Sequence, residues 1–229
     1  MATRTNRQGR TDGILNENCW YKDVCLYKKC QGCIRFTEMN YLMQHSNIPK
    51  AKQRPIELTP TVTEDKKTFA RLQNIKNNIV GIVDNGTNLY LTSKSTGNGK
   101  TSWSIKLMHK YFDSIWAGNG LRVRGLFIHV PTLLVQLKDF KNPVSSEFKK
   151  NIEQCDLVIW DDIASTELSN YDYSQLLVYV DSRILNEKSN IFTGNLPTKK
   201  ELEKVLGDRL ASRIFNTSEV IELKGKDMR

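Results

Sequence analysis

The sequence predicts an α/β protein in which a central parallel sheet is covered by helices. From residue 63 onward, strand-like and helix-like patterns alternate, which favours parallel strands joined by crossover helices. The apolar run Leu-Val-Ile-Trp at 157–160 has no polar alternation, which is typical of a central strand buried on both faces. The 229 residues leave room for one such domain and a small appendage.

The expected elements follow one another along the chain. A short helix at 36–45 precedes a linker at 47–62 that contains three prolines, and a helix over 63–79 begins with Thr63 as N-cap. The helix expected at 100–115 carries apolar residues at helical spacing. Strands are expected at 89–92, 125–130, 156–163, 190–193 and 219–223. Further helices are expected at 131–140, 145–153, 173–186, 198–206 and 208–214.

A phosphate-binding loop is predicted directly after the first strand. Residues 95–102 read Ser-Thr-Gly-Asn-Gly-Lys-Thr-Ser, a Gly-rich turn that opens a helix. Unpaired N–H groups at a helix N-terminus and the helix dipole favour an anion there. Lys100 would neutralise the β- and γ-phosphates, and Thr101 would offer a hydroxyl to Mg²⁺. The candidate nucleotide-binding residues are Thr96, Gly97, Asn98, Gly99, Lys100, Thr101 and Ser102.

This loop departs from the usual template at one position. The first Gly of G-x-x-x-x-G-K-[ST] falls on Lys94, and a chance Gly-x-Gly-Lys-Thr in a loop is the competing interpretation. The preceding strand and the following helical pattern favour the phosphate loop.

Two carboxylates end the apolar strand at 156–163. Acids at the carboxyl end of a parallel strand should lie beside the phosphate loop, where such sheets bind ligands. Asp161 would hold Mg²⁺ through its coordination shell, and Asp162 would orient or deprotonate an attacking water. The alternative is a strand that ends in a solvated turn. Both motifs in this order favour a site for ATP and Mg²⁺.

A cysteine cluster predicts a zinc-binding module near the N-terminus. Four clustered thiols in a reducing compartment are more often metal ligands than disulfides. The expected ligands of Zn²⁺ are Cys19, Cys25, Cys30 and Cys33. His45 is an alternative for one of them, because the Cys19–Cys25 spacing is loose. We therefore expect a flexible basic tail at 1–17, a zinc module at 18–46 and Cys155 packed as an apolar residue.

The charge balance favours a polyanionic partner. The formal net charge is +9, and residues 1–62 hold 10 Lys and Arg against 5 Asp and Glu. Nucleic acid would be attracted to this charge, although a solvated basic surface is the plain alternative. No apolar stretch reaches the roughly 20 residues of a membrane span, and the first ten residues are polar. We expect a cytoplasmic protein without a membrane partner.

Four landmarks in order resemble a known family. They are the phosphate loop, Leu-Val-Ile-Trp-Asp-Asp at 157–162, Phe-Thr-Gly-Asn at 192–195 and Gly-Asp-Arg-Leu-Ala-Ser-Arg-Ile at 207–214. This pattern resembles the AAA+ ATPases that load replicative helicases, the DnaC/DnaI type of phages and bacteria. DnaA initiators and IstB transposition ATPases are related to them. The resemblance covers residues 63–229 and implies an AAA+ P-loop ATPase domain there.

The resemblance also implies roles for single residues. Asn195 would be sensor 1, holding the attacking water or the γ-phosphate. Arg213 would be an arginine finger for the next protomer, with Arg209 as the runner-up, so the protein would self-associate and hydrolyse ATP slowly when alone. Arg229 would contact phosphate in its own protomer.

Partners follow from the same resemblance. The helices within 131–154 are similar to an insertion that lines a single-stranded DNA channel, although ordinary helix surface explains their lysines nearly as well. Candidate DNA contacts are Lys106, Lys110, Lys138, Phe140, Lys141, Lys149 and Lys150. The zinc module at 18–46 would hold a replicative helicase hexamer, which makes a helicase loader the leading interpretation. The alternatives are an IstB-like transposition ATPase, or a nucleotide-switched zinc protein that binds nucleic acid without turnover.

Overall fold

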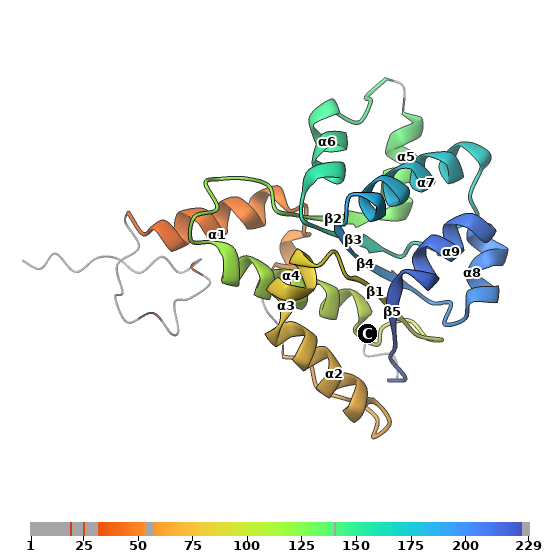
Figure 1. Ribbon diagram of the computed structural model, residues 1–229, viewed down its shortest axis with the longest axis horizontal. Coiled ribbons are helices and arrows are strands. Elements are labelled where there is room, and N and C mark those ends of the chain that lie inside the picture. The colour runs from red at the N-terminus through yellow and green to blue at the C-terminus, as the bar shows by residue number, and fades with distance from the viewer. Residues whose placement is uncertain (1–18, 20–24, 26–31, 54–56, 140, 226–229) are drawn as a thin grey trace, which may run out of the picture.

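A single parallel sheet forms the centre of the molecule (Figure 1). The computed structural model describes residues 19, 25, 32–53, 57–139 and 141–225. The predictions for residues 1–17, Cys30, Phe140 and Arg229 lie outside this part of the chain. Within it, five strands pair in the order β2-β3-β4-β1-β5, all parallel. Their bounds are β1 Asn88–Thr92, β2 Gly125–His129, β3 Leu157–Asp161, β4 Ser189–Gly194 and β5 Ser218–Glu222. The expected parallel α/β sheet is confirmed.

Helices cover both faces of this sheet and enclose two apolar cores. The first face carries α1 Ile34–His45, α2 Asp65–Asn77, α3 Ile79–Asp84 and α4 Lys100–Ile115. The second carries α5 Val130–Lys138, α6 Ser146–Gln154, α7 Asn170–Leu185, α8 Lys199–Leu206 and α9 Asp208–Asn216. Along β1, Leu89 and Leu91 enter the first core and Tyr90 enters the second. This alternation explains why the strands read as continuous apolar runs.

Helix ends differ from expectation at two helices. Helix α2 begins at Asp65 with Glu64 at the N-cap position, so the expected N-cap Thr63 lies one residue too early. The expected helix over 63–79 ends at Asn77, because Asn78 has φ −108° and ψ 23°, and the chain continues as α3. Helix α7 begins at Asn170, three residues before the expected start. There Ser169 and Asp172 satisfy each other's backbone N–H groups in a capping box.

The helix α1 packs differently from the expected domain division. Met39, Leu42 and Met43 on α1 are buried in the same core as α4. Beyond the helix, the Ser46 carbonyl accepts a hydrogen bond of 2.7 Å from the Phe127 N–H of β2. The zinc module was expected to extend to residue 46. In the structure, α1 instead packs as part of the main domain. The sheet face offers these apolar side chains a larger surface than a small module could.

Strand order brings the chemically important strand ends together. Strand β1 lies beside β4, with Thr92 opposite Gly194, and β4 lies beside β3, with Trp160 opposite Phe192. The loops that follow β1, β3 and β4 therefore leave the same edge of the sheet as neighbours. This is the edge at which open parallel sheets bind ligands.

The turn at Gly86 yields a stability prediction, because it lies against the turn that leads into β4. Gly86 has φ 62°, and a Cβ there would lie 2.4 Å from the Glu187 carbonyl oxygen. Gly118 has φ 81° but open space around it. Both changes to Ala should lower the free energy of unfolding by about 1–2 kcal/mol for the left-handed backbone. Gly86→Ala should lose about 1–3 kcal/mol more from the clash.

Urea denaturation of the two variants measures this difference. Equal losses for Gly86→Ala and Gly118→Ala would contradict the close packing of the two turns.

Candidate functional site

The loop after β1 has the backbone of a phosphate cradle. Gly97 and Gly99 adopt φ values of 69° and 94°, in the left-handed region that glycine tolerates. The 16-residue helix α4 begins immediately afterwards at Lys100, so its first N–H groups open toward the loop. Lys94, at the template's missing Gly, is exposed and outside this tight turn.

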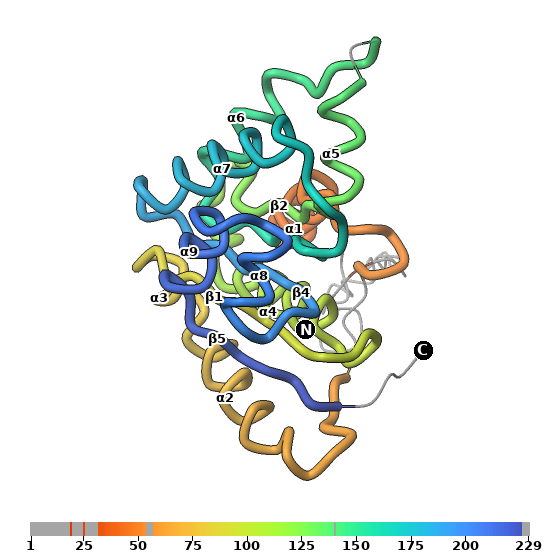
Figure 2. The backbone as a smooth tube through the Cα atoms, turned by 90° about the vertical axis from the view of Figure 1, so that its right-hand side faces the viewer, coloured from red at the N-terminus to blue at the C-terminus, as the bar shows by residue number. Residues whose placement is uncertain are grey.

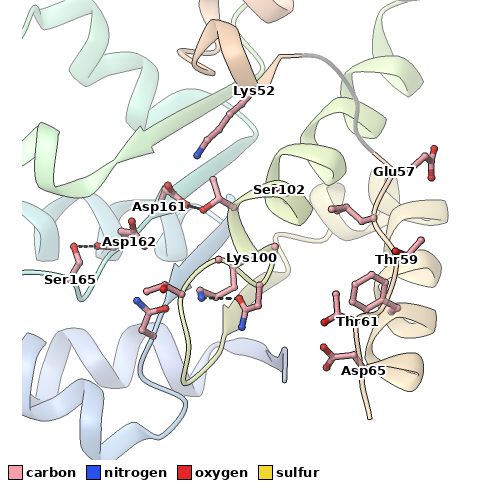
Figure 3. A pocket seen from close by; sticks show the side chains of 18 of the residues that line it. Lys52, Glu57, Thr59, Thr61, Asp65, Lys100, Ser102, Asp161, Asp162 and Ser165 are labelled. Carbon is pink, nitrogen blue, oxygen red and sulfur yellow. Dashed lines mark hydrogen bonds between the residues drawn. The ribbon is translucent and has the colours of Figure 1, made fainter. Parts of the chain in front are cut away.

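Lys100 is held inside the loop that precedes it. Its side chain is nearly buried, at 6% exposure, and its ammonium donates to the Ser95 carbonyl at 3.0 Å and to Asn98 Oδ1 at 3.1 Å (Figure 3). Asn98 is buried as well and bonds to Ser93. The lysine is thus positioned beside the turn, and phosphate oxygens could replace its two neutral acceptors.

One carboxylate oxygen joins three elements of the site. Asp161 Oδ1 accepts hydrogen bonds from Thr101 Oγ1 on α4 at 2.7 Å and from Thr193 Oγ1 on β4 at 2.8 Å. Burial raises the pKa of Asp161, while the two hydroxyl donors lower it. Asp161 and Thr101, the two residues expected to hold Mg²⁺, are therefore in contact. A carboxylate and a hydroxyl are oxygen ligands of the kind Mg²⁺ takes, so the donor set fits the ion.

Asp162 turns away from the buried network. It has φ 56°, its N–H donates to Thr193 Oγ1 at 3.0 Å, and its side chain is 39% exposed. Its Oδ2 lies 3.8 Å from Nε2 of His129, whose Nδ1 lies 2.8 Å from Thr132 Oγ1. Asp162 is thus accessible beside the metal-binding candidate, as a group that activates water must be.

Sequence reasoning missed His129. The ring sits at the end of β2, paired in register with Asp161, and the ligand atoms of His129, Asp161 and Asp162 lie within 4.8 Å of one another. In the sequence, His129 is only a histidine near the carboxyl end of an expected strand. Its place beside Asp161 follows only once β2 is known to pair with β3.

A pocket of about 880 Å³ unites these groups. Its size is within the about 300–1,000 Å³ that ligand pockets commonly have. Asn195 also lines it, and its buried Oδ1 accepts no hydrogen bond from the described residues. Such an orphan acceptor beside a pocket is best explained by a partner that arrives with the ligand. The remaining lining residues are Lys52, Glu57, Leu58, Thr59, Thr61, Asp65, Phe69, Thr96–Ser102 and Ser165.

The chain after β5 is bonded to the phosphate loop and to the start of α2. The buried carboxylate of Asp65 accepts from the Lys224 N–H at 2.8 Å, and Ser95 Oγ donates to the Gly225 carbonyl at 3.3 Å. Figure 2 shows this segment passing the orange segment that leads into α2. The chain toward Arg229 thus starts beside the phosphate loop, although Arg229 itself is outside the described residues.

The two arginines expected at a protomer interface share one partner. Arg213 Nε lies 2.6 Å from Asp181 Oδ1, and Arg209 Nη2 lies 3.0 Å from Asp181 Oδ2. Their side chains are 39% and 63% exposed, and neither lines the pocket. Both guanidinium groups therefore lie at the surface beside an acid of α7 and outside the pocket lining.

Several lysines expected to contact DNA have acidic partners. Lys138 Nζ lies 2.6 Å from Asp172 Oδ2, and this carboxylate is almost buried. Lys110 pairs with Asp113 at 3.6 Å, and Lys106 pairs with Glu57 at 3.7 Å and is only 15% exposed. These lysines support the fold as ion pairs, so their DNA contacts stay predictions. Lys141, Lys149 and Lys150 lie beyond α5 and on α6.

The cysteine prediction is only partly within the described chain. Cys19, Cys25 and Cys33 are half-buried, and Cys30 lies outside the described residues. Among the described residues, no group of three possible metal ligands includes a cysteine. The alternative ligand His45 has Nδ1 2.9 Å from the Tyr41 carbonyl oxygen. Cys155 is buried in the second core, as expected.

None of the helices in the described residues combines the length and apolar character needed to cross a bilayer.

Comparisons with known proteins agree with the fold. A family model described as IstB-like ATP binding protein matches residues 35–229. The crystal structure of the DnaC helicase loader is similar, with a TM-score of 0.61 and 22% identity over 73% of this chain and 94% of that chain. That of DnaI has a TM-score of 0.63 and 18% identity over 80% of this chain and 95% of that chain.

A more distant structural relative is AMPPCP-bound DnaA from Aquifex aeolicus. It has a TM-score of 0.56 and 17% identity over 77% of this chain and 51% of that chain. No curated protein matches the chain. At such identities the structural likeness establishes a shared fold and nothing finer.

Proposed function

The chain belongs to the IstB-like ATP-binding protein family, and we propose that it loads a hexameric replicative helicase onto single-stranded DNA at the expense of ATP. The observation that carries the ATPase part is the meeting of Lys100, Thr101, Asp161 and Asp162 at one pocket. The loading part is supported by the AAA+ fold shared with the DnaC helicase loader and DnaI.

The geometry supports hydrolysis by an activated water. The N–H groups of the phosphate loop and Lys100 would bind the phosphates, and Thr101 with Asp161 would hold Mg²⁺, which neutralises charge on the triphosphate. Asp162 would accept the proton of a water whose oxygen attacks the γ-phosphorus, while the bond to the β-phosphate oxygen breaks and ADP leaves. Asn195 would orient that water or the γ-phosphate. Each role matches a side chain that lines the pocket.

Completion of this site would need a second protomer. We propose that Arg213 stabilises the developing phosphoryl charge in the neighbouring protomer's site. Its surface position and its distance from its own pocket's lining support action in trans. Asp181 would hold the guanidinium group in place until assembly.

The N-terminal residues before α1 would recognise the helicase. We propose that Cys19, Cys25, Cys30 and Cys33 bind Zn²⁺ and fold this segment, which is too short to bury a core of its own. Single-stranded DNA would bind the main domain, with Lys138, Phe140 and Lys141 among its contacts.

A transposition ATPase of the IstB kind is the second candidate. The description of the matching family favours it. Such a protein would bind duplex DNA and a transposase, whereas a loader would bind a helicase and single-stranded DNA. A nucleotide switch without turnover is the third, and only a measurement of hydrolysis separates it from the others.

We expect Asp162→Asn to separate binding from turnover. The change removes the proton acceptor but leaves the phosphate loop intact, so ATP affinity should stay within about twofold while the hydrolysis rate falls about 100-fold or more. The exposed Lys94→Ala is the matched control and should change neither quantity. A steady-state phosphate-release assay with the DNA-bound protein gives the rate. A wild-type protein that binds ATP but releases no phosphate would support the switch without turnover, and an unchanged, measurable rate for Asp162→Asn would contradict its role as proton acceptor.

Mixing two inactive variants tests action in trans. Arg213→Ala should bind ATP normally and lose DNA-stimulated hydrolysis, because its neighbours receive no finger. Adding an excess of Asp162→Asn protein should restore activity, since this protein supplies Arg213 to the intact pockets of the other variant. The same mixing with Arg209→Ala identifies which arginine acts. If assembled mixtures of Arg213→Ala and Asp162→Asn stay inactive, the finger assignment fails.

Metal content and helicase binding should be lost together. The purified protein should contain about one zinc ion per chain and should retain the cognate helicase in a pull-down. The double change Cys30→Ser and Cys33→Ser should abolish both, while Cys155→Ser is the control for an unrelated thiol. Retention of a transposase and duplex DNA in place of helicase would favour the second candidate.

A further inference from the structure

A second lysine reaches the nucleotide pocket from the segment expected to be a linker. Lys52 ends the short 3₁₀ helix η1 (Lys50–Lys52) and lines the same pocket as Lys100 and Asp161. Figure 3 shows its ammonium group pointing into the pocket toward Asp161, from the wall opposite the phosphate loop. No pattern around residue 52 predicted this position.

The backbone that carries Lys52 is anchored to the main domain on both sides. Ile48 is buried in the first core, and the Ser46 carbonyl is bonded to β2. On the other side of Lys52, the Gln53 side chain donates to the Ile48 carbonyl at 2.9 Å, and His109 of α4 hydrogen-bonds the Gln53 backbone. The position of Lys52 is therefore fixed by contacts of its backbone segment with β2 and α4.

Asp161 is the acid that Lys52 points toward (Figure 3). Burial raises the pKa of this carboxyl, while the charge of the Lys52 ammonium group lowers it. The two do not form an ion pair, and Asp161 Oδ1 already accepts hydrogen bonds from Thr101 and Thr193. Asp161 and Asp162 bring two negative charges to this end of the pocket, whereas Lys100 brings one positive charge. Without Lys52, this end of the pocket would repel an anion. A polyphosphate is the partner that accounts for a second ammonium group here.

We propose that Lys52 binds the terminal phosphate of the bound nucleoside triphosphate in its own protomer. This inference rests on the proposed ATPase function. Lys52 points toward Asp161, one of the two residues that would hold Mg²⁺ beside the terminal phosphates (Figure 3). The contact therefore distinguishes a triphosphate from a diphosphate.

This contact also connects the N-terminal segment to the phosphate site. Cys33, one of the expected zinc ligands, is the N-cap of α1, and α1 leads through Ile48 to Lys52. A shift of α1 on partner binding would move Lys52 relative to the phosphates.

Nucleotide binding by three lysine variants tests the proposal. Lys52→Ala should weaken binding of a non-hydrolysable ATP analogue with Mg²⁺ about tenfold, because a charge-assisted contact is lost. Its ADP affinity should change less than about twofold. Lys50→Ala, on the same short helix and outside the pocket lining, should alter neither affinity, and Lys52→Arg should restore most of the loss. Isothermal titration calorimetry gives the dissociation constants of the wild type and the three variants for both nucleotides, and unchanged thermal unfolding of Lys52→Ala confirms the fold.

Two results would overturn this assignment. One is an Lys52→Ala protein that binds the ATP analogue as tightly as the wild type, and the other is an equal loss of ATP analogue and ADP. Either leaves the proposed function standing if the wild type binds ATP and Lys100→Ala does not. A wild-type protein that binds no nucleotide would instead remove both proposals.

Discussion

The site depends on the shared carboxylate oxygen of Asp161. A buried carboxylate is costly, and here hydroxyl groups of Thr101 and Thr193 offset part of that cost. These two bonds join the helix that follows the phosphate loop to β3 and β4. The loop, the expected metal ligands and the polar strand ends are therefore held in one arrangement by the protein's own contacts, and such preorganisation lowers the reorganisation needed for chemistry. The raised pKa of Asp161 shows that this arrangement retains a cost that a bound cation would relieve.

The parallel order of the strands explains why this arrangement is possible. Because β1 is paired with β4 and β4 with β3, the loops after all three leave one edge of the sheet side by side. The next strand, β2, adds His129 beside Asp162. Arg209 and Arg213 pair with Asp181 of α7 and do not line the pocket. The surface that would complete a neighbour's site is therefore separate from the pocket. This separation is what an ATPase assembled from identical protomers requires.

Helix α1 and the described residues within 46–65 are part of the main domain, and several of the residues within 46–65 line the pocket, although residues 47–62 were expected to be only a linker. Helix α1 is buried against α4, and the chain from Ser46 to Gln53 is bonded to β2 and α4 before it reaches the pocket. The following residues 57–65 form a wall of the same pocket, with Asp65 bonded to the chain after β5. Segments from both ends of the domain thus surround a site whose chemical groups come from the sheet.

Sequence patterns alone identified the features that depend on neighbouring residues. The Gly-rich turn with Lys100 and Thr101, the apolar strand that ends in Asp161, and most helices follow from local spacing, since backbone conformation and side-chain periodicity are local properties. The tertiary structure decided where α1 packs, that Lys138 pairs with Asp172, and that Lys52 and His129 reach the pocket. These features join residues far apart in the chain. They depend on strand order and on which apolar surface is available for burial, and no short stretch of sequence contains either.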